Sequence, residues 1–195
     1  MKKHSFLNAT DLVEIQNKSE NVFSGKLLDV YLDHAILPDG ETATREWFKH
    51  PGACAVVPVF EDGTIMLVKQ YRYAVGQIFY EVPAGKIDAG EPQEETASRE
   101  LLEESGLLAS DLHYVGHFYP GIGFSDEIIH IYTAWNLSLK KQNVDDDEFL
   151  INYRVPYKKA IEMINQGVIS DGKSICSILK TKEWWKENQP FDVQF

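Results

Sequence analysis

The first half of the chain shows the hydrophobic pattern of short β-strands. Residues 22–48 alternate apolar and polar positions around a Pro-Asp-Gly turn at 38–40, which predicts a small antiparallel lobe. Two strongly apolar runs follow at 53–60 and 64–73, and the Glu-Asp-Gly sequence between them predicts a hairpin. We therefore expect the chain to begin with β-structure and to enter its core near residue 53.

The second half alternates between helical and strand-like patterns. A short strand at 77–82 leads to a helix between Pro92, which suits the first turn because it lacks an N–H, and Gly106, which suits a left-handed stop. Further elements are expected as strands at 112–119 and 127–137 and as helices at 156–166 and 173–187. Strands that alternate with helices indicate an α/β protein.

Length and charge narrow the classes of function. A chain of 195 residues with 44% apolar residues can form one cored domain with a small attached lobe. The balance of 19 basic and 30 acidic residues, a net charge of −11, repels polyanions and disfavours non-specific nucleic-acid binding. A diphosphate can still bind such a protein where a metal ion reverses the local charge.

The composition also suggests a cellular location. The first fifteen residues lack the apolar core of a signal peptide, and no apolar run approaches the roughly 20 residues of a membrane span. Cys54 and Cys176 lie in apolar strings, so we expect buried, reduced thiols. These features predict a cytoplasmic protein without a membrane partner.

The most informative segment is residues 85–107, GKIDAGEPQEETASRELLEESGL. Seven of its nine fixed positions are specific Gly, Glu or Arg residues, and a chance match is on the order of a few in a billion per register. The nine positions are Gly85, Glu91, Arg99, Glu100, Leu101, Glu103, Glu104, Gly106 and Leu107. Chance therefore does not explain the pattern.

The spacing of the glutamates indicates metal chemistry. Glu100, Glu103 and Glu104 stand at i, i+3 and i+4 and so share one helix face, where three carboxylates repel one another. A hard divalent cation reverses that cost because it prefers oxygen ligands. Arg99 precedes Glu103 by four residues and can hold a carboxylate in one rotamer. For an isolated pair of glutamates, the alternative to metal binding is a charged helix face exposed to solvent.

The segment resembles the Nudix box and matches it at every fixed position. The resemblance implies Mg²⁺-dependent hydrolysis of a nucleoside diphosphate linked to another group, with Mn²⁺ as an alternative ion. It also implies an α/β/α sandwich with a mixed β-sheet at 51–195, preceded by an antiparallel β lobe at 1–50 that serves dimerisation and substrate contact. By similarity, Glu100, Glu103 and Glu104 bind metal and Arg99 supports them.

Flanking segments are similar to one branch of that family, the ADP-ribose pyrophosphatases. The similar stretches are 50–53, 68–73, 81–88 and 118–132. This branch converts ADP-ribose to AMP and ribose 5-phosphate, and some members prefer another nucleotide sugar such as GDP-mannose. One departure weakens the choice of substrate: the branch typically carries proline where this chain has Ile122, and Pro120 stands two residues earlier.

The resemblance also implies further site residues. The carbonyl of Ala84 binds metal, Arg72 contacts the nucleotide, and Glu127 holds substrate groups across the interface of a homodimer. His50 lies where related enzymes place a basic group near phosphate, although it also reads as an incidental residue at a strand end. Gly123 belongs to a glycine-rich loop that either lets the backbone approach a ligand or simply turns the chain. The alternative interpretation of Arg72 is an exposed arginine on a strand without a role in binding.

The catalytic base is expected among carboxylates. The acidic run 145–148 is either a solvated loop or, as the resemblance implies, a source of the residue that activates water. We favour Glu148 over Asp146, with Glu103 or Glu104 as the alternative base. Two other functions stay open: a broader nucleotide-sugar hydrolase, and a ligand-binding regulator built on the same fold.

Overall fold

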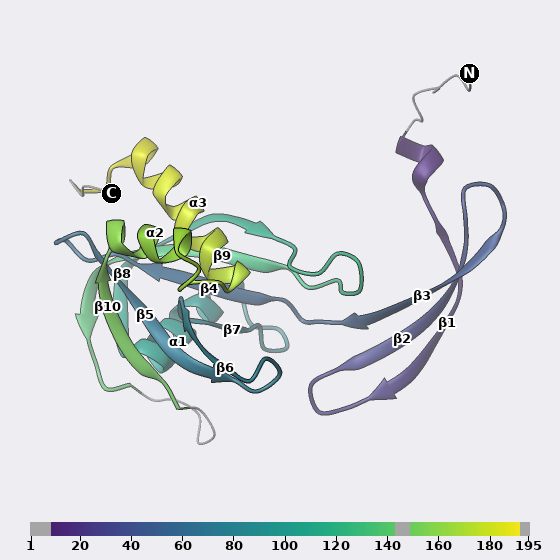
Figure 1. The fold of residues 1–195 in the computed structure, drawn as a ribbon, viewed down its shortest axis with the longest axis horizontal. Coiled ribbons are helices and arrows are strands. Elements are labelled where there is room, and N and C mark those ends of the chain that lie inside the picture. The colour runs from purple at the N-terminus through teal and green to yellow at the C-terminus, as the bar shows by residue number, and fades with distance from the viewer. Residues whose placement is uncertain (1–8, 143–148, 192–195) are drawn as a thin grey trace. The chain divides into compact units, whose positions relative to one another are not determined.

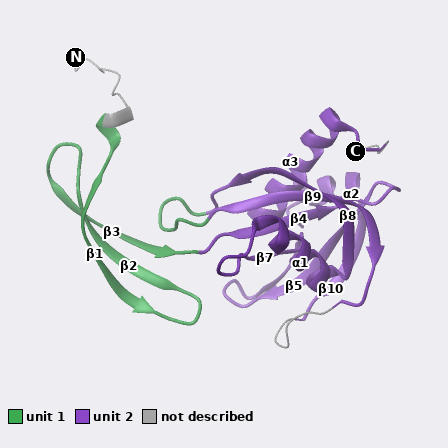
Figure 2. Cartoon of the chain, turned by 180° about the vertical axis from the view of Figure 1, so that it is seen from behind, with its two compact units in different colours: residues 1–50, 121–127 green, residues 51–120, 128–195 purple. Residues whose placement is uncertain are grey.

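The computed structural model describes residues 9–142 and 149–191, which divide into two compact units (Figures 1 and 2). The first unit ends at His50 and also includes the loop Gly121–Glu127. The second unit comprises Pro51–Pro120 and the chain from Ile128 onward. The first unit therefore consists of two stretches that are distant in sequence.

The first unit is a three-stranded antiparallel sheet in the order β1-β2-β3. Its elements are a 3-10 helix at Ala9–Leu12 and the strands β1 (Ile15–Ser24), β2 (Asp29–Ile36) and β3 (Thr42–Lys49). The predicted lobe is present, but β1 begins before the expected residue 22. Its start is fixed by pairing with β2, for example Ile15 with Ile36, which the polar sequence of β1 does not reveal.

In its described residues, the second unit contains two sheets and three helices. The first sheet has the order β7-β4-β9-β8 and the second has the order β10-β5-β6. Strands β4 and β9 run parallel, whereas the other pairs are antiparallel, so the first sheet is mixed. The elements are β4 (Ala53–Pro58), β5 (Thr64–Arg72), β6 (Gln77–Glu81), β7 (Ala84–Lys86), α1 (Gln93–Ser105), β8 (Leu107–Phe118), β9 (Ile129–Leu139), β10 (Ile151–Pro156), α2 (Tyr157–Asn165) and α3 (Gly172–Asn188).

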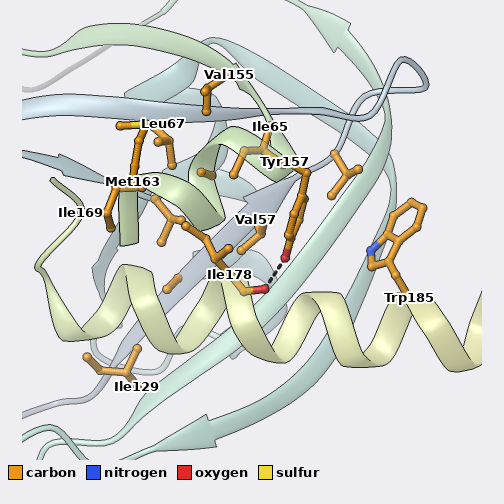
Figure 3. Close-up of a cluster of buried hydrophobic side chains, with 14 of the residues drawn as sticks. Val57, Ile65, Leu67, Ile129, Val155, Tyr157, Met163, Ile169, Ile178 and Trp185 are labelled. Atoms are coloured by element: carbon orange, nitrogen blue, oxygen red, sulfur yellow. Dashed lines mark hydrogen bonds between the residues drawn. The ribbon is translucent and has the colours of Figure 1, made fainter. Parts of the chain in front are cut away.

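Strand β4 shows why helices cover both faces of the mixed sheet. All six of its residues are buried, and successive side chains point to opposite faces. Cys54 and Val56 belong to one core cluster with Leu101 of α1. Ala55 and Val57 belong to a second cluster with side chains of α2 and α3, among them those labelled in Figure 3. The predicted α/β/α sandwich is confirmed.

Two strands differ from the sequence expectations. Strand β8 begins directly after Gly106, before the expected residue 112, because it pairs along its length with β9. Strand β10, at Ile151–Pro156, was missed, and it is held by antiparallel pairing with β5. Its side chains are mostly exposed, so its sequence carries little hydrophobic signal.

Two further expectations concern the thiols and the membrane. Cys54 is buried as expected, but Cys176 is only half-buried, and both are free thiols. None of the helices in the described ranges combines the length and hydrophobicity needed to cross a bilayer.

Candidate active site around helix α1

Helix α1 carries the box glutamates and has the ends that its sequence predicts. Pro92 precedes the first helical residue with φ −64° and ψ 143°. Gly106 ends the helix with φ 68°, and its N–H donates to the carbonyl of Leu102. Ala97 and Leu101 are buried in the core cluster under β4, which anchors the helix and sets the direction of its polar face.

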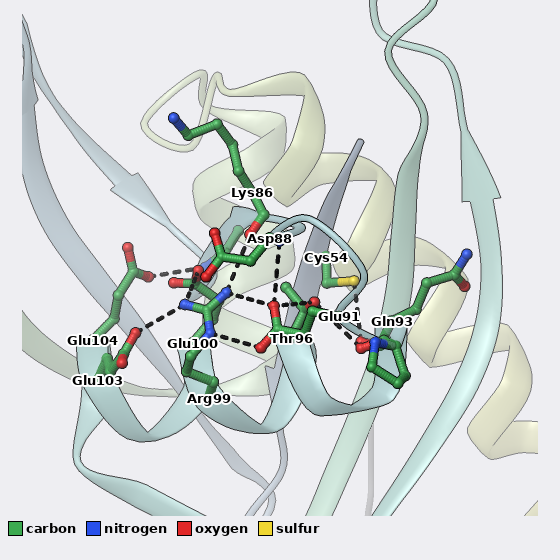
Figure 4. Close-up of polar contacts among 12 residues, drawn as sticks. Cys54, Lys86, Asp88, Glu91, Gln93, Thr96, Arg99, Glu100, Glu103 and Glu104 are labelled. Carbon is green, nitrogen blue, oxygen red and sulfur yellow. Dashed lines mark hydrogen bonds and ion pairs between the residues drawn. The ribbon is translucent and has the colours of Figure 1, made fainter. Parts of the chain in front are cut away.

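Arg99 lies at the centre of the box carboxylates (Figure 4). Its Nη1 is 2.7 Å from a carboxylate oxygen of Glu100 and 3.0 Å from one of Glu103. Its Nε and Nη2 each lie 2.9 Å from an oxygen of Glu91, and Nη2 also donates to the carbonyl of Lys86. One guanidinium thus offsets the mutual repulsion of three carboxylates.

This network fixes the charge states of its members. Hydrogen bonds from Arg99 and then Thr96 lower the pKa of Glu91 to about 2. The hydrogen bonds to Glu91, and next those to Glu100, raise the pKa of Arg99. Both groups therefore stay charged across the physiological pH range, and Glu91 forms a salt bridge with Arg99.

The backbone of β7 meets two box carboxylates. The amide N–H of Ala84 donates to Glu104 at 2.9 Å, and Glu104 is buried. The carboxylate of Glu100 lies against Gly85, where an added Cβ would come within 2.0 Å of its Oε1. A side chain at position 85 would occupy the space that the Glu100 carboxylate fills, so glycine is required here for close approach.

The donor set suits a hard divalent cation. Glu100, Glu103 and Glu104 supply only oxygen ligands, and two of them lie close enough to share one nitrogen of Arg99. Within the described ranges, no three His, Cys, Asp or Glu side chains are gathered as a ready metal site. The reason is visible for Glu100 and Glu103, whose carboxylates point at Arg99. In donor type, and in the proximity of Glu100 to Glu103, the residues fit such an ion.

Arg72 is held by a residue that the sequence analysis missed. Its Nε and Nη2 donate to the two carboxylate oxygens of Glu81 at 2.8 and 2.7 Å. The side chain of Glu81 is 3% exposed and that of Arg72 is 43% exposed, so the pair presents a cation at the surface. The Glu81 hydrogen bonds are the main cause of the raised pKa of Arg72, and the charge of Glu104 adds to it. The signal in the sequence was a glutamate placed at the end of an apolar strand.

Three expected substrate residues lie in the first unit. His50 Nδ1 is 3.7 Å from a carboxylate oxygen of Glu127, and the His50 amide donates to Asp126 at 2.7 Å. Gly123 lies in a tight turn closed by hydrogen bonds to the carbonyl of Gly121, and an added Cβ there would meet nothing within 4 Å. The loop therefore forms a turn with open space beside Gly123, and a contact of Gly123 with substrate stays a prediction.

The expected base, Glu148, and the run 145–148 lie outside the described residues. Among the described residues, the structure adds an apolar pocket of about 670 Å³ lined by Lys69, Tyr71, Ile78, Gln142 and residues 149–151. Tyr71 of β5 is 56% exposed and lines this pocket.

Comparisons with known proteins agree with this geometry. The NUDIX domain model matches residues 36–176. The chain is 40% identical over 168 residues to an ADP-ribose pyrophosphatase of Bacillus subtilis (strain 168), covering 84% of this chain and 91% of that protein. It is 38% identical over 164 residues to a methanol dehydrogenase activator of Bacillus methanolicus, covering 83% and 88%.

A solved structure shows the same fold. The crystal structure of an ADP compounds hydrolase superposes with a TM-score of 0.81 at 22% identity, covering 91% of this chain and 97% of that one. The family model spans the box, the strands that support it and the start of α3. The chain belongs to the family of NUDIX-domain proteins.

Proposed function

We propose that this protein hydrolyses the diphosphate bond of ADP-ribose, giving AMP and ribose 5-phosphate, in a reaction that requires Mg²⁺. The observation that carries the proposal is the intact carboxylate face of α1, organised by Arg99 and set against β7. Similarity to an ADP-ribose pyrophosphatase over most of both chains supports the choice of substrate.

The residues divide into metal ligands and groups that bind substrate. Glu100, Glu103, Glu104 and the carbonyl of Ala84 hold the divalent ion, Mg²⁺ or alternatively Mn²⁺. When bound, such an ion neutralises a diphosphate and lowers the pKa of water. Arg99 keeps the carboxylates grouped, as its contacts with Glu100 and Glu103 support.

Other side chains act directly on substrate or water in this proposal. Arg72 binds an anionic group of the nucleotide, and Glu127, Gly123 and His50 contact the substrate. Glu148 takes the proton from the attacking water, with Glu103 or Glu104 as the alternative. A base must come within about 2.6–3.2 Å of the water that it deprotonates.

A second candidate function is regulation of another enzyme. The relative at 38% identity is named as an activator, which favours this candidate. Turnover separates the two: a hydrolase forms product with metal and substrate alone, whereas a regulator binds a ligand without consuming it.

The decisive experiment is a product assay. Purified protein is incubated with Mg²⁺ and ADP-ribose, GDP-mannose, UDP-glucose or diadenosine polyphosphates, with EDTA as the metal-free control, and products are separated by chromatography. We expect AMP to form fastest from ADP-ribose and only with metal. Faster hydrolysis of another nucleotide sugar would show that this sugar, and not ADP-ribose, is the preferred substrate. Binding without turnover would favour the function of a regulator.

The metal assignment is tested by Glu104→Gln. We expect the activity to fall by more than roughly 100-fold, since even outer residues around a metal typically cost 10–100-fold. Circular dichroism checks that the fold is retained, and Glu162→Gln, an exposed carboxylate on α2, is the matched control. Full Mg²⁺-dependent activity in Glu104→Gln would refute the assignment.

A further inference from the structure

The N-terminus of α3 supplies a second cation to the carboxylate that holds Arg72. Lys173 Nζ lies 2.7 Å from Glu81 Oε2 and 2.9 Å from Asp171 Oδ2. Its side chain is 15% exposed. Glu81 therefore lies between the cations of Arg72 and Lys173, which come from β5 and α3.

We propose that Lys173 is a positioning residue for Arg72: its ammonium fixes the Glu81 carboxylate, which in turn fixes the guanidinium that binds the substrate. The inference rests on the role proposed for Arg72 above. Nε and Nη2 of Arg72 face Glu81, and Nη1 takes no part in this pair. A fixed carboxylate thus orients a planar cation whose remaining edge is available to an anionic group of the substrate.

Helix stability does not account for a lysine at this place. Lys173 is the second residue of α3, and the positive end of a helix dipole disfavours a cation there. The ends of helices that favour lysine are the carboxyl ends. The ion pairs with Glu81 and Asp171 compensate for this cost, so the ammonium is placed for its partners.

Attachment of α3 to β6 does not require the ammonium either. The amide of Val82 donates to Ser174 Oγ at 2.9 Å, which joins the helix to the end of β6. Asp171 caps the helix by accepting from the amides of Lys173 and Ser174. The ammonium of Lys173 adds ion pairs with Glu81 and Asp171 to these contacts.

The charges of Glu81, Arg72 and Lys173 support the proposal that Lys173 acts on Arg72 through Glu81. Burial tends to raise the pKa of Glu81, but Arg72 and Lys173 outweigh it and hold the pKa below the ordinary value. Glu81 is therefore a carboxylate at neutral pH. Removal of the Lys173 ammonium would leave a buried carboxylate with Arg72 as its remaining cation among these groups. Glu81 could then change its orientation, and the guanidinium of Arg72 would no longer be held in one place.

The test is a double-mutant cycle on ADP-ribose hydrolysis. We expect Lys173→Met to raise KM about tenfold with a smaller change in kcat, as for a lost charged hydrogen bond. Lys173→Arg should restore KM to within about threefold of the wild type. In an Arg72→Met background, Lys173→Met should change kcat/KM by less than about twofold, because its effect passes through Arg72.

Control variants separate positioning from general destabilisation. Lys159→Met removes an exposed lysine that pairs with Glu162 on α2 and should leave KM unchanged. If Lys173→Met does not fold, Lys173→Gln replaces it in the cycle. Additive effects of Arg72→Met and Lys173→Met would overturn the proposal, because Lys173 would then act independently of Arg72.

A readout without turnover separates this proposal from the function on which it rests. Hydrogen exchange of the Arg72 Nε–H, assigned by its loss in Arg72→Met, reports the bond to Glu81 directly. Lys173→Met should speed that exchange several-fold, Lys173→Arg should reverse the change, and Lys159→Met should have no effect. If wild-type protein hydrolyses nothing, the proposed function fails and this exchange alone decides; an unchanged rate in Lys173→Met would overturn the inference.

Discussion

Single residues in the box are constrained by close contacts as well as by charge. Arg99 binds three carboxylates, and Gly85 leaves room for one of them. A glutamate displaced along the helix would lose its contact with Arg99 or its approach to β7.

Gly85→Ala should impair activity more than stability. The new Cβ would come within 2.0–2.4 Å of the Glu100 carboxyl group, which is the far end of a flexible side chain and can move away. We expect kcat/KM to fall at least tenfold and the free energy of unfolding to change by less than about 1 kcal/mol. Gly172→Ala, whose Cβ meets nothing within 4 Å, is the control. Equal activity in both variants would contradict the contact.

Cys54 should be unreactive in the folded protein. Burial, and next the charges of Glu100 and Glu91, raise the pKa of its thiol from 9.0 to about 12, so the reactive thiolate is scarce at pH 8. Titration with a thiol reagent at pH 8 should label at most Cys176 in native protein and both cysteines in guanidinium chloride. Rapid native labelling of a Cys176→Ser variant would disprove the prediction.

At the scale of elements, the left-handed end of α1 connects the site to the sheet. Gly106 both ends the helix and begins the pairing of β8 with β9, and its carbonyl accepts from the amide of Lys140. The carbonyl of Ser105 accepts from Asn152, next to the start of β10. The helix end is therefore packed between the chain segments that flank residues 143–148.

Gly106→Ala should destabilise the protein more than Gly167→Ala. Both glycines have positive φ, 68° and 72°, so alanine costs about 1–2 kcal/mol of strain at either position. At Gly106 the new Cβ would also lie 2.9 Å from the backbone oxygen of Lys140, whereas at Gly167 it meets nothing within 4 Å. We expect a further loss of roughly 1–3 kcal/mol at Gly106, measured by urea unfolding. Equal losses of unfolding free energy in the two variants would contradict this expectation and show that the backbone at Lys140 moves to make room.

At the scale of the whole molecule, the sheet of the first unit leaves apolar side chains exposed that its own packing does not cover. Nine of the ten residues of β1 are exposed, among them Ile15, Val22 and Phe23. Exposed apolar side chains on a three-stranded sheet are typical of a surface that another chain covers. The homodimer expected from the family resemblance remains a prediction, and this sheet is its most suitable interface.

Sedimentation equilibrium tests the dimer. We expect a species of twice 22.2 kDa at micromolar concentration. Val22→Ser combined with Phe23→Ser should shift the protein toward the monomer, because both side chains are more than half exposed in the single chain. Leu179→Ser, an exposed leucine on α3, is the control for a change of hydrophobicity elsewhere. A 22.2 kDa species alone in the wild type would exclude the dimer.

The sequence by itself determined the features that depend on local spacing. Helix α1 runs between Pro92 and Gly106 as predicted, and the pair of Arg99 with Glu103 follows from a separation of four residues on that helix. The two-sided burial of β4 was visible as an unbroken apolar run. The family is confirmed by the NUDIX domain model, whose match over residues 36–176 includes the box.

Only the tertiary structure decided which distant residues meet. Lys173 reaches Glu81 across 92 positions, and β10 exists because β5 offers it a pairing edge. The segment Ile151–Pro156 carries little hydrophobic signal because most of its residues are exposed. The residues next to Lys173 in the sequence do not indicate Glu81 as its partner. Contacts of this kind are selected by the packing of the core, which depends on the whole chain and not on the spacing within one segment.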